Sequence, residues 1–380
     1  MGATSPATGF SAAVAQTPID DPYWDRRSPA YPLHCGRMRG TLPGSPASAC
    51  EPNPLPEPGL GIAIFNEREG LGDGFSKLYL LRALKRAYPQ ETITWVVSES
   101  DSPYRVVMAE IARPYVDRVI VDAHIRGPSL AAFRNLRRLG RFSLVIDHRT
   151  DSLVIAMTKV AMRTKRYQAA SPGFLFCSRR PRGSRPKHKL GQLMMLLEAV
   201  TGCPPDGSGE IELPPAIAAA AAALLPEGPR YVGLAPGASS RTRCWPIEKF
   251  VGLATWIQDR GWSPVMLLGP DEQDLRGPLR EALPQALFPA SSNAETLTDV
   301  RLTLAIGARL SAAVAMDTGI GHLLAATGTP LVSLFGPSNP ERWKAVGGPV
   351  QIVSAQTYGG PEIARIPVTA VSSALDEMMR

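Results

Sequence analysis

The sequence lacks any apolar run long enough to cross a lipid bilayer. Its 380 residues are 44% hydrophobic and 20% charged, which is ordinary for a globular protein, and no uninterrupted apolar stretch reaches the roughly 18–20 residues of a membrane helix. The first residues also lack a basic head followed by a continuous apolar segment, so we expect no secretory signal. These absences favour a cytoplasmic protein.

Cysteine is scarce, and none of it shows the Cys-x-x-Cys spacing of a metal or redox site. An odd, unpatterned set of cysteines argues for a reducing compartment and against a structural metal. We therefore expect no metal and no cofactor. The five residues are Cys35, Cys50, Cys177, Cys203 and Cys244.

Acidic residues are in the minority, and the formal net charge is +7. Much of the excess lies in residues 163–168 and 178–189, where no regularly spaced aromatics or finger motif accompany it. Nucleic acid is therefore not an expected partner. Two interpretations of the 178–189 stretch stay open at this stage: a solvated loop, or a loop that faces phosphate or a membrane surface.

Residues 1–59 show no periodic apolar pattern and are rich in proline, serine, alanine and glycine. This composition predicts a disordered or linker-like extension. From Leu60 onward, short apolar runs alternate with helical stripes. One such stripe places Phe75, Leu78, Leu81 and Leu84 on a single helix face. Strand–helix alternation predicts a parallel sheet covered on both faces.

The alternation is repeated after residue 230, which predicts a second unit of the same kind. We expect an α/β protein with two Rossmann-like domains, at residues 60–212 and 213–380, facing across a cleft. Ligands of such sheets bind beyond the carboxyl ends of the strands. The loops expected there are residues 67–73, 236–245, 269–274 and 317–322.

The stretch AMDTGIGH places small and polar residues between an apolar strand and a short apolar helix. Free backbone N–H groups at such a helix start attract an anion, typically a phosphate, and glycines let a ligand approach the backbone. The candidates are Asp317, Thr318, Gly319, Gly321 and His322. The alternatives are that Asp317 or Thr318 merely caps the helix and that His322 is structural.

A second expected strand ends within the stretch LAPGASSRTRCWP and is followed there by a loop. Ser239 and Ser240 supply hydroxyls, and Arg241 and Arg243 supply guanidinium groups that bind phosphate bidentately. This combination indicates a diphosphate site, and the alternative is an ordinary surface turn. The loop NEREGLGDG contributes Asp73, a carboxylate suited to act as general base on a hydroxyl or, alternatively, to cap a helix.

Six stretches, taken in this order, resemble glycosyltransferase family 9, the heptosyltransferases of lipopolysaccharide inner-core assembly. The resemblance covers about residues 60–378. The six are GLGD (70–73), TWVVSES (94–100) and residues 142–166, 234–246, 265–274 and 316–343.

This resemblance implies a GT-B fold of two Rossmann-like domains and metal-independent transfer that inverts the anomeric carbon. It implies an ADP-activated heptose as donor and a lipid-linked glycan as acceptor, bound at the cytoplasmic face of the inner membrane. By position, Asp73 resembles the catalytic base, and Arg243 replaces a lysine that binds the donor diphosphate.

The resemblance also assigns the remaining donor contacts. Ser239 and Ser240 match hydroxyl positions near the phosphates, and Thr318 and Gly319 match the phosphate-binding helix start. Asp317 resembles the acid that holds the donor sugar, and Glu272 the acid that binds the nucleotide ribose.

Three other functions remain as alternatives. One is a nucleotide-sugar epimerase of the same fold, and another is a non-catalytic nucleotide-sugar-binding protein. An NAD-dependent oxidoreductase is disfavoured, because the first strand is not followed by Gly-x-Gly-x-x-Gly and an acid about 20 residues later.

Overall fold

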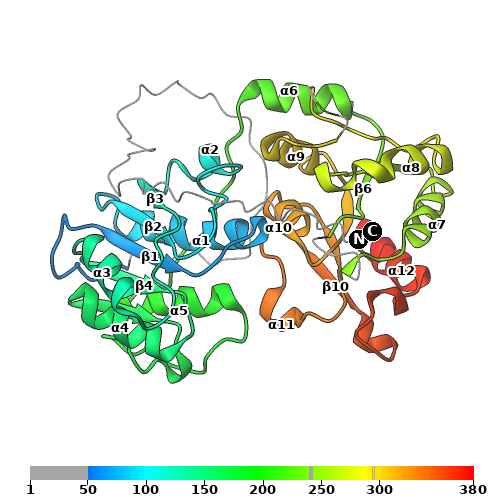
Figure 1. The fold of residues 1–380 in the computed structure, drawn as a ribbon. Coiled ribbons are helices and arrows are strands. Elements are labelled where there is room, and N and C mark those ends of the chain that lie inside the picture. The colour runs from blue at the N-terminus through cyan, green and yellow to red at the C-terminus, as the bar shows by residue number, and fades with distance from the viewer. Residues whose placement is uncertain (1–49, 239–242, 293, 295) are drawn as a thin grey trace, which may run out of the picture.

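The computed structural model describes residues 50–238, 243–292, 294 and 296–380, which form two parallel five-stranded sheets (Figure 1). The first sheet has the order β3-β2-β1-β4-β5 and the second the order β10-β9-β8-β6-β7. The predicted pair of doubly wound α/β domains is confirmed. The first sheet consists of β1 Ile62–Asn66, β2 Ile93–Val97, β3 Arg118–Ile120, β4 Leu144–Asp147 and β5 Arg166–Ala169. The second consists of β6 Tyr231–Ala235, β7 Ser263–Met266, β8 Ala312–Met316, β9 Leu331–Phe335 and β10 Val350–Ser354.

The central strands are apolar and fully buried, which follows from helices covering both faces of a parallel sheet. Strand β3 differs from these central strands. It lies at a sheet edge with its residues partly exposed, because only β2 pairs with it. Strands β5 and β10 were not predicted, and they also close the sheets at their edges.

Helices α1 Leu71–Ala87 and α10 Gly319–Ala326 pack against each other between the two sheets (Figure 1). Both begin earlier than their apolar stripes suggested. The other helices are α2 Ala109–Ala112, α3 Leu130–Arg138, α4 Ser152–Met162, α5 Lys189–Thr201, α6 Pro215–Leu224, α7 Ile247–Gln258, α8 Arg276–Ala282, α9 Val300–Gly307, α11 Pro340–Trp343 and α12 Val368–Met379. None of the described helices is long and apolar enough to cross a membrane.

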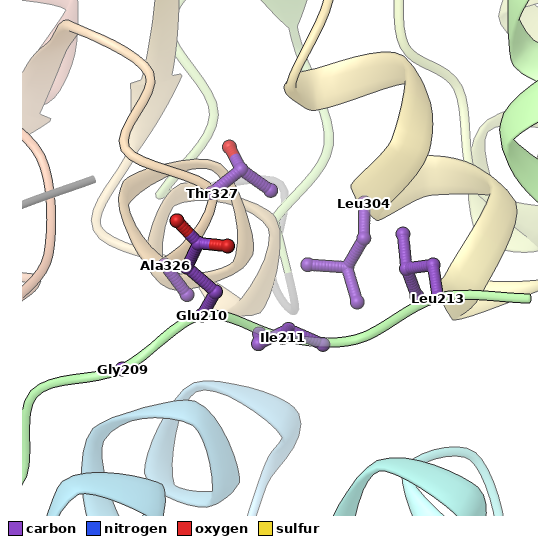
Figure 2. A pocket seen from close by; sticks show the side chains of 7 residues that line it. All are labelled: Gly209, Glu210, Ile211, Leu213, Leu304, Ala326 and Thr327. Carbon is purple, nitrogen blue, oxygen red and sulfur yellow. The ribbon is translucent and has the colours of Figure 1, made fainter. Parts of the chain in front are cut away.

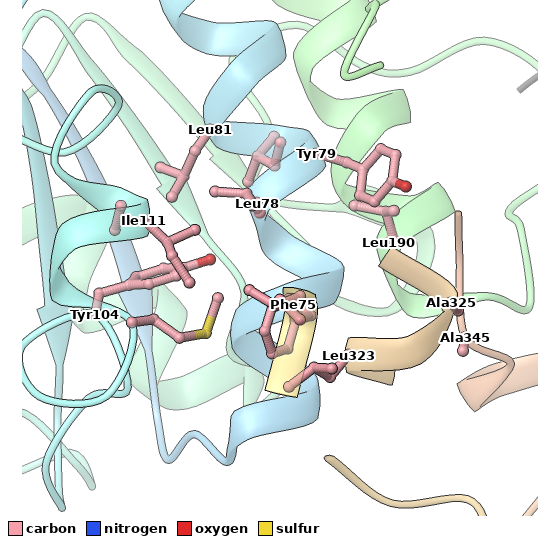
Figure 3. Close-up of a cluster of buried hydrophobic side chains, with 14 of the residues drawn as sticks. Phe75, Leu78, Tyr79, Leu81, Tyr104, Ile111, Leu190, Leu323, Ala325 and Ala345 are labelled. Carbon is pink, nitrogen blue, oxygen red and sulfur yellow. The ribbon is translucent and has the colours of Figure 1, made fainter. Parts of the chain in front are cut away.

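A continuous apolar core joins the two halves (Figure 3). Phe75 and Leu78 of α1 belong to the same buried cluster as Leu323 of α10. The chain passes from α5 to α6, which packs against α9 beside the second sheet. The boundary expected near residue 212 falls in this connection and stays a prediction.

Residues 50–59 are ordered against the first sheet domain, so the prediction that this stretch is a disordered linker is wrong. The Asn53 backbone N–H donates to the Thr201 carbonyl at 2.7 Å, and Leu55 is buried. Local composition predicted disorder because it carries no information about contacts between residues almost 150 positions apart, such as Asn53 and Thr201. Residues 1–49 lie outside the described part of the chain.

Cys50 and Cys203 form a disulfide that ties this segment to the turn after α5. The cysteine spacing had argued for a reducing compartment, and the structure contradicts the unpaired state implied for these two. The pair is separated by 153 positions, so only the fold brings the two thiols together. Cys177 is a free thiol.

Candidate functional site

The candidate site forms where the N-termini of α1 and α10 meet. Helix α1 follows β1, and α10 follows β8, so both helices start at the carboxyl ends of their strands. A Cβ on Gly319 would lie 3.0 Å from the Leu71 Cβ and 3.4 Å from the Gly72 nitrogen. A Cβ on Gly72 would lie 2.8 Å from His322 Cδ2. The absence of side chains at these positions lets the two helix starts approach each other.

This packing gives the glycines of the TGIG turn a role within the protein itself, and their expected role toward a ligand stays a prediction. Both had been expected to let a ligand approach the backbone. A side chain at Gly319 would point toward α1, and a Cβ on Gly321 would lie 2.8 Å from the Met316 carbonyl oxygen. Each glycine therefore makes room for protein atoms.

Asp73 lies in the first turn of α1 with both carboxylate oxygens engaged. Oδ2 accepts a hydrogen bond from the Gly70 backbone N–H at 3.3 Å, and Oδ1 lies 4.0 Å from Lys77 Nζ. Through the Gly70 hydrogen bond, Asp73 does help to cap the start of α1, which was the alternative to a role as general base. The side chain is nevertheless 36% exposed, so the carboxylate remains accessible to a hydroxyl.

Asp317 and Thr318 come from the turn between β8 and α10. The Asp317 backbone N–H bonds to the Leu334 carbonyl, and its side chain is only 12% exposed. Thr318 occupies the N-cap position, but its hydroxyl lies 3.4 Å from the Met316 carbonyl and makes no capping bond. Thr318 therefore does not supply the usual side-chain cap to the first N–H groups of α10.

His322 connects the two halves of the site. Its Nδ1 lies 3.0 Å from the Ser76 hydroxyl on α1, and its Nε2 lies 3.9 Å from Asp317 Oδ1. Burial lowers the pKa of His322, while the charges of Asp317 and Asp73 oppose that shift. The two carboxylates of the predicted site are thus close enough to act on the same imidazole.

Arg243 approaches Asp317 from the loop after β6. Its Nη2 lies 3.9 Å from Asp317 Oδ2, and its side chain is 40% exposed. This places a guanidinium group beside the start of α10, and its role toward a donor stays a prediction. Ser239, Ser240 and Arg241 lie outside the described residues.

Glu272 lies at the carboxyl end of β7, where its Oε2 accepts the Gly269 backbone N–H at 2.9 Å. A Cβ on Gly237 would lie 2.3 Å from Glu272 Oε1, so the carboxylate rests on the loop after β6. Burial raises the pKa of Glu272, and Asp271 and Asp274 raise it further against the Gly269 hydrogen bond. The acid therefore borders the same sheet edge as Arg243.

The basic stretch at residues 178–189 contacts the second half of the protein, which sequence reasoning missed. Lys187 pairs with Glu341 at 2.7 Å, and His188 Nε2 lies 2.8 Å from the Lys344 carbonyl. The stretch is therefore more than a solvated loop. Whether it meets phosphate or membrane stays a prediction.

Lys189, at the start of α5, is a further cation near Asp73 that the sequence did not single out. Burial, together with the charges of Arg342 and Arg185, lowers the pKa of Lys189 to about 8. Asp73 acts in the opposite direction, which indicates that its carboxylate is close. Helical periodicity gave no signal for this contact.

A small cavity lies away from these groups, at the far end of α10 (Figure 2). Its volume is about 20 Å³, room for roughly one water molecule. The lining comes from the segment before α6 and from Leu304, Ala326 and Thr327. It lies beside the connection between the domains.

Comparison with known proteins connects this arrangement to one family. The family model of glycosyltransferase family 9 (heptosyltransferase) matches residues 132–367, which is more than half of the chain. The match includes Arg243, Glu272 and Asp317 and leaves out Asp73.

The curated relatives cover shorter stretches. Lipooligosaccharide heptosyltransferase 2 of Haemophilus influenzae is 29% identical over 120 residues, 31% of this chain and 34% of that protein. Lipopolysaccharide heptosyltransferase 1 of Pseudomonas aeruginosa is 39% identical over 115 residues, 30% of each chain. The chain thus spans about a third of the length of the curated relatives it matches.

Solved structures share the fold over almost their whole length. A family 9 glycosyl transferase from Veillonella parvula has a TM-score of 0.64 at 19% identity, covering 85% of this chain and 98% of that one. An Escherichia coli heptosyltransferase with ADP has a TM-score of 0.57 at 20% identity, covering 83% and 99%. These likenesses establish the two-domain GT-B architecture.

Proposed function

Because the chain belongs to glycosyltransferase family 9, we propose that it transfers a sugar from a nucleotide-diphosphate donor to a glycan acceptor. The donor sugar is a heptose carried by ADP, and the acceptor belongs to the lipopolysaccharide core. The curated names support this choice, as does the ADP bound to a structural neighbour.

The observation that carries the proposal is the meeting of α1 and α10. It brings Asp73, which is 36% exposed, next to a helix start bordered by Arg243 and Asp317. A general base therefore lies beside a region suited to a diphosphate. A helix start and a guanidinium group are both good phosphate partners.

In the proposed mechanism the donor diphosphate binds at the start of α10, against Arg243. Thr318, Gly319 and Gly321 supply the backbone of that start. Asp317 binds hydroxyls of the donor sugar. The hydroxyls of Ser239 and Ser240 add phosphate contacts, and Glu272 binds the ribose.

Asp73 accepts the proton of the acceptor hydroxyl while that oxygen attacks the anomeric carbon. The bond from this carbon to the diphosphate breaks, and its electron pair leaves with the phosphate oxygen. Attack from the face opposite the leaving group inverts the anomeric centre. Arg243 and the backbone N–H groups stabilise the developing negative charge, the task a metal ion would otherwise perform.

The acceptor is proposed to be lipid-linked, which places the reaction at the cytoplasmic face of a membrane. The lipid part would remain in the bilayer while the glycan reaches the site between the two domains. Peripheral contact through the basic stretch at residues 178–189 is part of this proposal.

The experiment is a product assay with ADP-heptose, run with and without a lipopolysaccharide-core acceptor. We expect a lengthened glycan and free ADP only when both substrates are present. An epimerase would convert the donor without acceptor, and a binding protein would bind the donor without turnover. Either result would contradict the transferase proposal.

A further inference from the structure

Lys77 is an almost fully buried lysine one helical turn after Asp73. Its side chain is 4% exposed, and its ammonium donates to Asn66 Oδ1 at 3.0 Å and to Glu69 Oε1 at 2.7 Å. Two of its three donors are thereby used. On the remaining side the ammonium lies 4.0 Å from Asp73 Oδ1.

Glu69 is held as firmly as the lysine it pairs with. Its side chain is fully buried, and its Oε2 accepts the Trp95 indole N–H at 2.6 Å and the Ser102 hydroxyl at 3.0 Å. Trp95 is in β2, and Asn66 ends β1. The lysine ammonium is therefore anchored to the first sheet and to the loop after β2.

Stability alone is a poor explanation for this pair. Removing two charges from water is costly, and apolar residues of similar volume often serve as well or better. A rigid buried cation beside a partly exposed carboxylate has a clearer use in orienting that carboxylate. The Gly70 N–H fixes one oxygen of Asp73, and the Lys77 ammonium attracts the other.

We propose that Lys77, locked in place by Glu69, is a positioning residue that holds Asp73 in its working orientation. This inference rests on the proposed function, in which Asp73 is the general base. It differs from a structural role in what it predicts. Loss of the ammonium lowers turnover even in a variant whose folding is intact.

The test compares Lys77→Met with the double variant Glu69→Gln, Lys77→Met. The single variant leaves a buried carboxylate without its cation and should lower the melting temperature. The double variant removes that charge and keeps an acceptor for the Trp95 N–H, so it should melt close to the native protein. We expect kcat to stay at least tenfold below the native value in both, with the donor KM within twofold.

The matched control is Lys85→Met on the same helix. Lys85 also forms a partly buried pair, with Asp117 Oδ2 at 3.4 Å, but it lies about three helical turns from Asp73. We expect this variant to lose melting temperature and to keep its kcat.

If both kcat and the melting temperature of the double variant returned to the native values, the proposal would be overturned and Lys77 would be a structural residue. So would an equal kcat loss in Lys85→Met. Asp73→Asn is measured alongside. If that variant retained turnover, the proposed base would be wrong independently of Lys77.

Discussion

Ser76 of α1 and His322 of α10 meet across the junction of the two sheets, with the hydroxyl 3.0 Å from Nδ1. One residue comes from the turn that carries Asp73 and the other from the helix that begins beside Asp317. The contact therefore joins the proposed base to the proposed donor site. It also makes the junction sensitive to the charge of a single imidazole.

We expect this contact to weaken in acid. Burial lowers the pKa of His322, with His188 acting in the same direction and Asp317 and Asp73 opposing. The unfolded chain then binds the proton first as the pH falls. The stability contributed by neutral His322 is present above the ordinary histidine pKa of about 6.5 and is lost as the pH falls through the lower folded value.

The measurement is the free energy of unfolding between pH 7.5 and 5 for the native protein and His322→Gln. The free energy of unfolding of the native protein should approach that of His322→Gln as the pH falls. A constant difference across this range would show that His322 does not titrate with folding.

Asp73→Ala should lower turnover by about 10²–10⁴ because it removes the proposed base. Donor affinity should change little, since the donor binds on the other side of the junction. Steady-state kinetics and calorimetric titration with ADP provide the two readouts. Near-native turnover in this variant would remove Asp73 from the mechanism.

Arg243→Ala should weaken transition-state stabilisation by about 3–4 kcal/mol, because the leaving diphosphate loses a cation. Binding of ADP should weaken as well. Arg182→Ala is a suitable comparison, since Arg182 is an exposed arginine of the basic stretch. Equal effects in the two variants would indicate a general loss of positive charge.

Gly319→Val should destabilise the protein by about 1–3 kcal/mol through overpacking against Leu71 and Gly72. It should also lower turnover, because α1 must shift away from α10. Gly252→Val in α7 is the control, since a Cβ there meets nothing within 4 Å. Thermal melts and kcat are measured for both variants. A loss in Gly319→Val alone indicates the local clash, and equal losses in both indicate a general effect of replacing a helical glycine.

The Cys50–Cys203 disulfide should stabilise the oxidised protein by up to about 5 kcal/mol, given a closed loop of 153 positions. Reductant should therefore lower the melting temperature of the native protein and leave Cys50→Ser unchanged. Thiol titration of denatured protein should count two more thiols after reduction. Equal counts before and after would show that the pair is reduced as purified.

Local sequence determined all but one strand of each sheet and most of the helices, because apolar periodicity depends only on neighbouring residues. For α1 and β8, the element predicted from the sequence is the one found in the structure, except that the helix begins a few positions earlier. The same reasoning located Asp73, Arg243, Glu272 and Asp317, since loops after parallel strands gather at one sheet edge. Their roles in catalysis stay predictions.

Only the tertiary structure decided what surrounds those residues. The glycines of the TGIG turn make room for α1 and for a strand carbonyl, Lys77 is locked to Glu69, and Cys50 reaches Cys203. Each contact depends on how separate elements pack, either across the junction or within the first domain. Periodicity along the chain carries no information about such packing, because each local pattern is compatible with many neighbours.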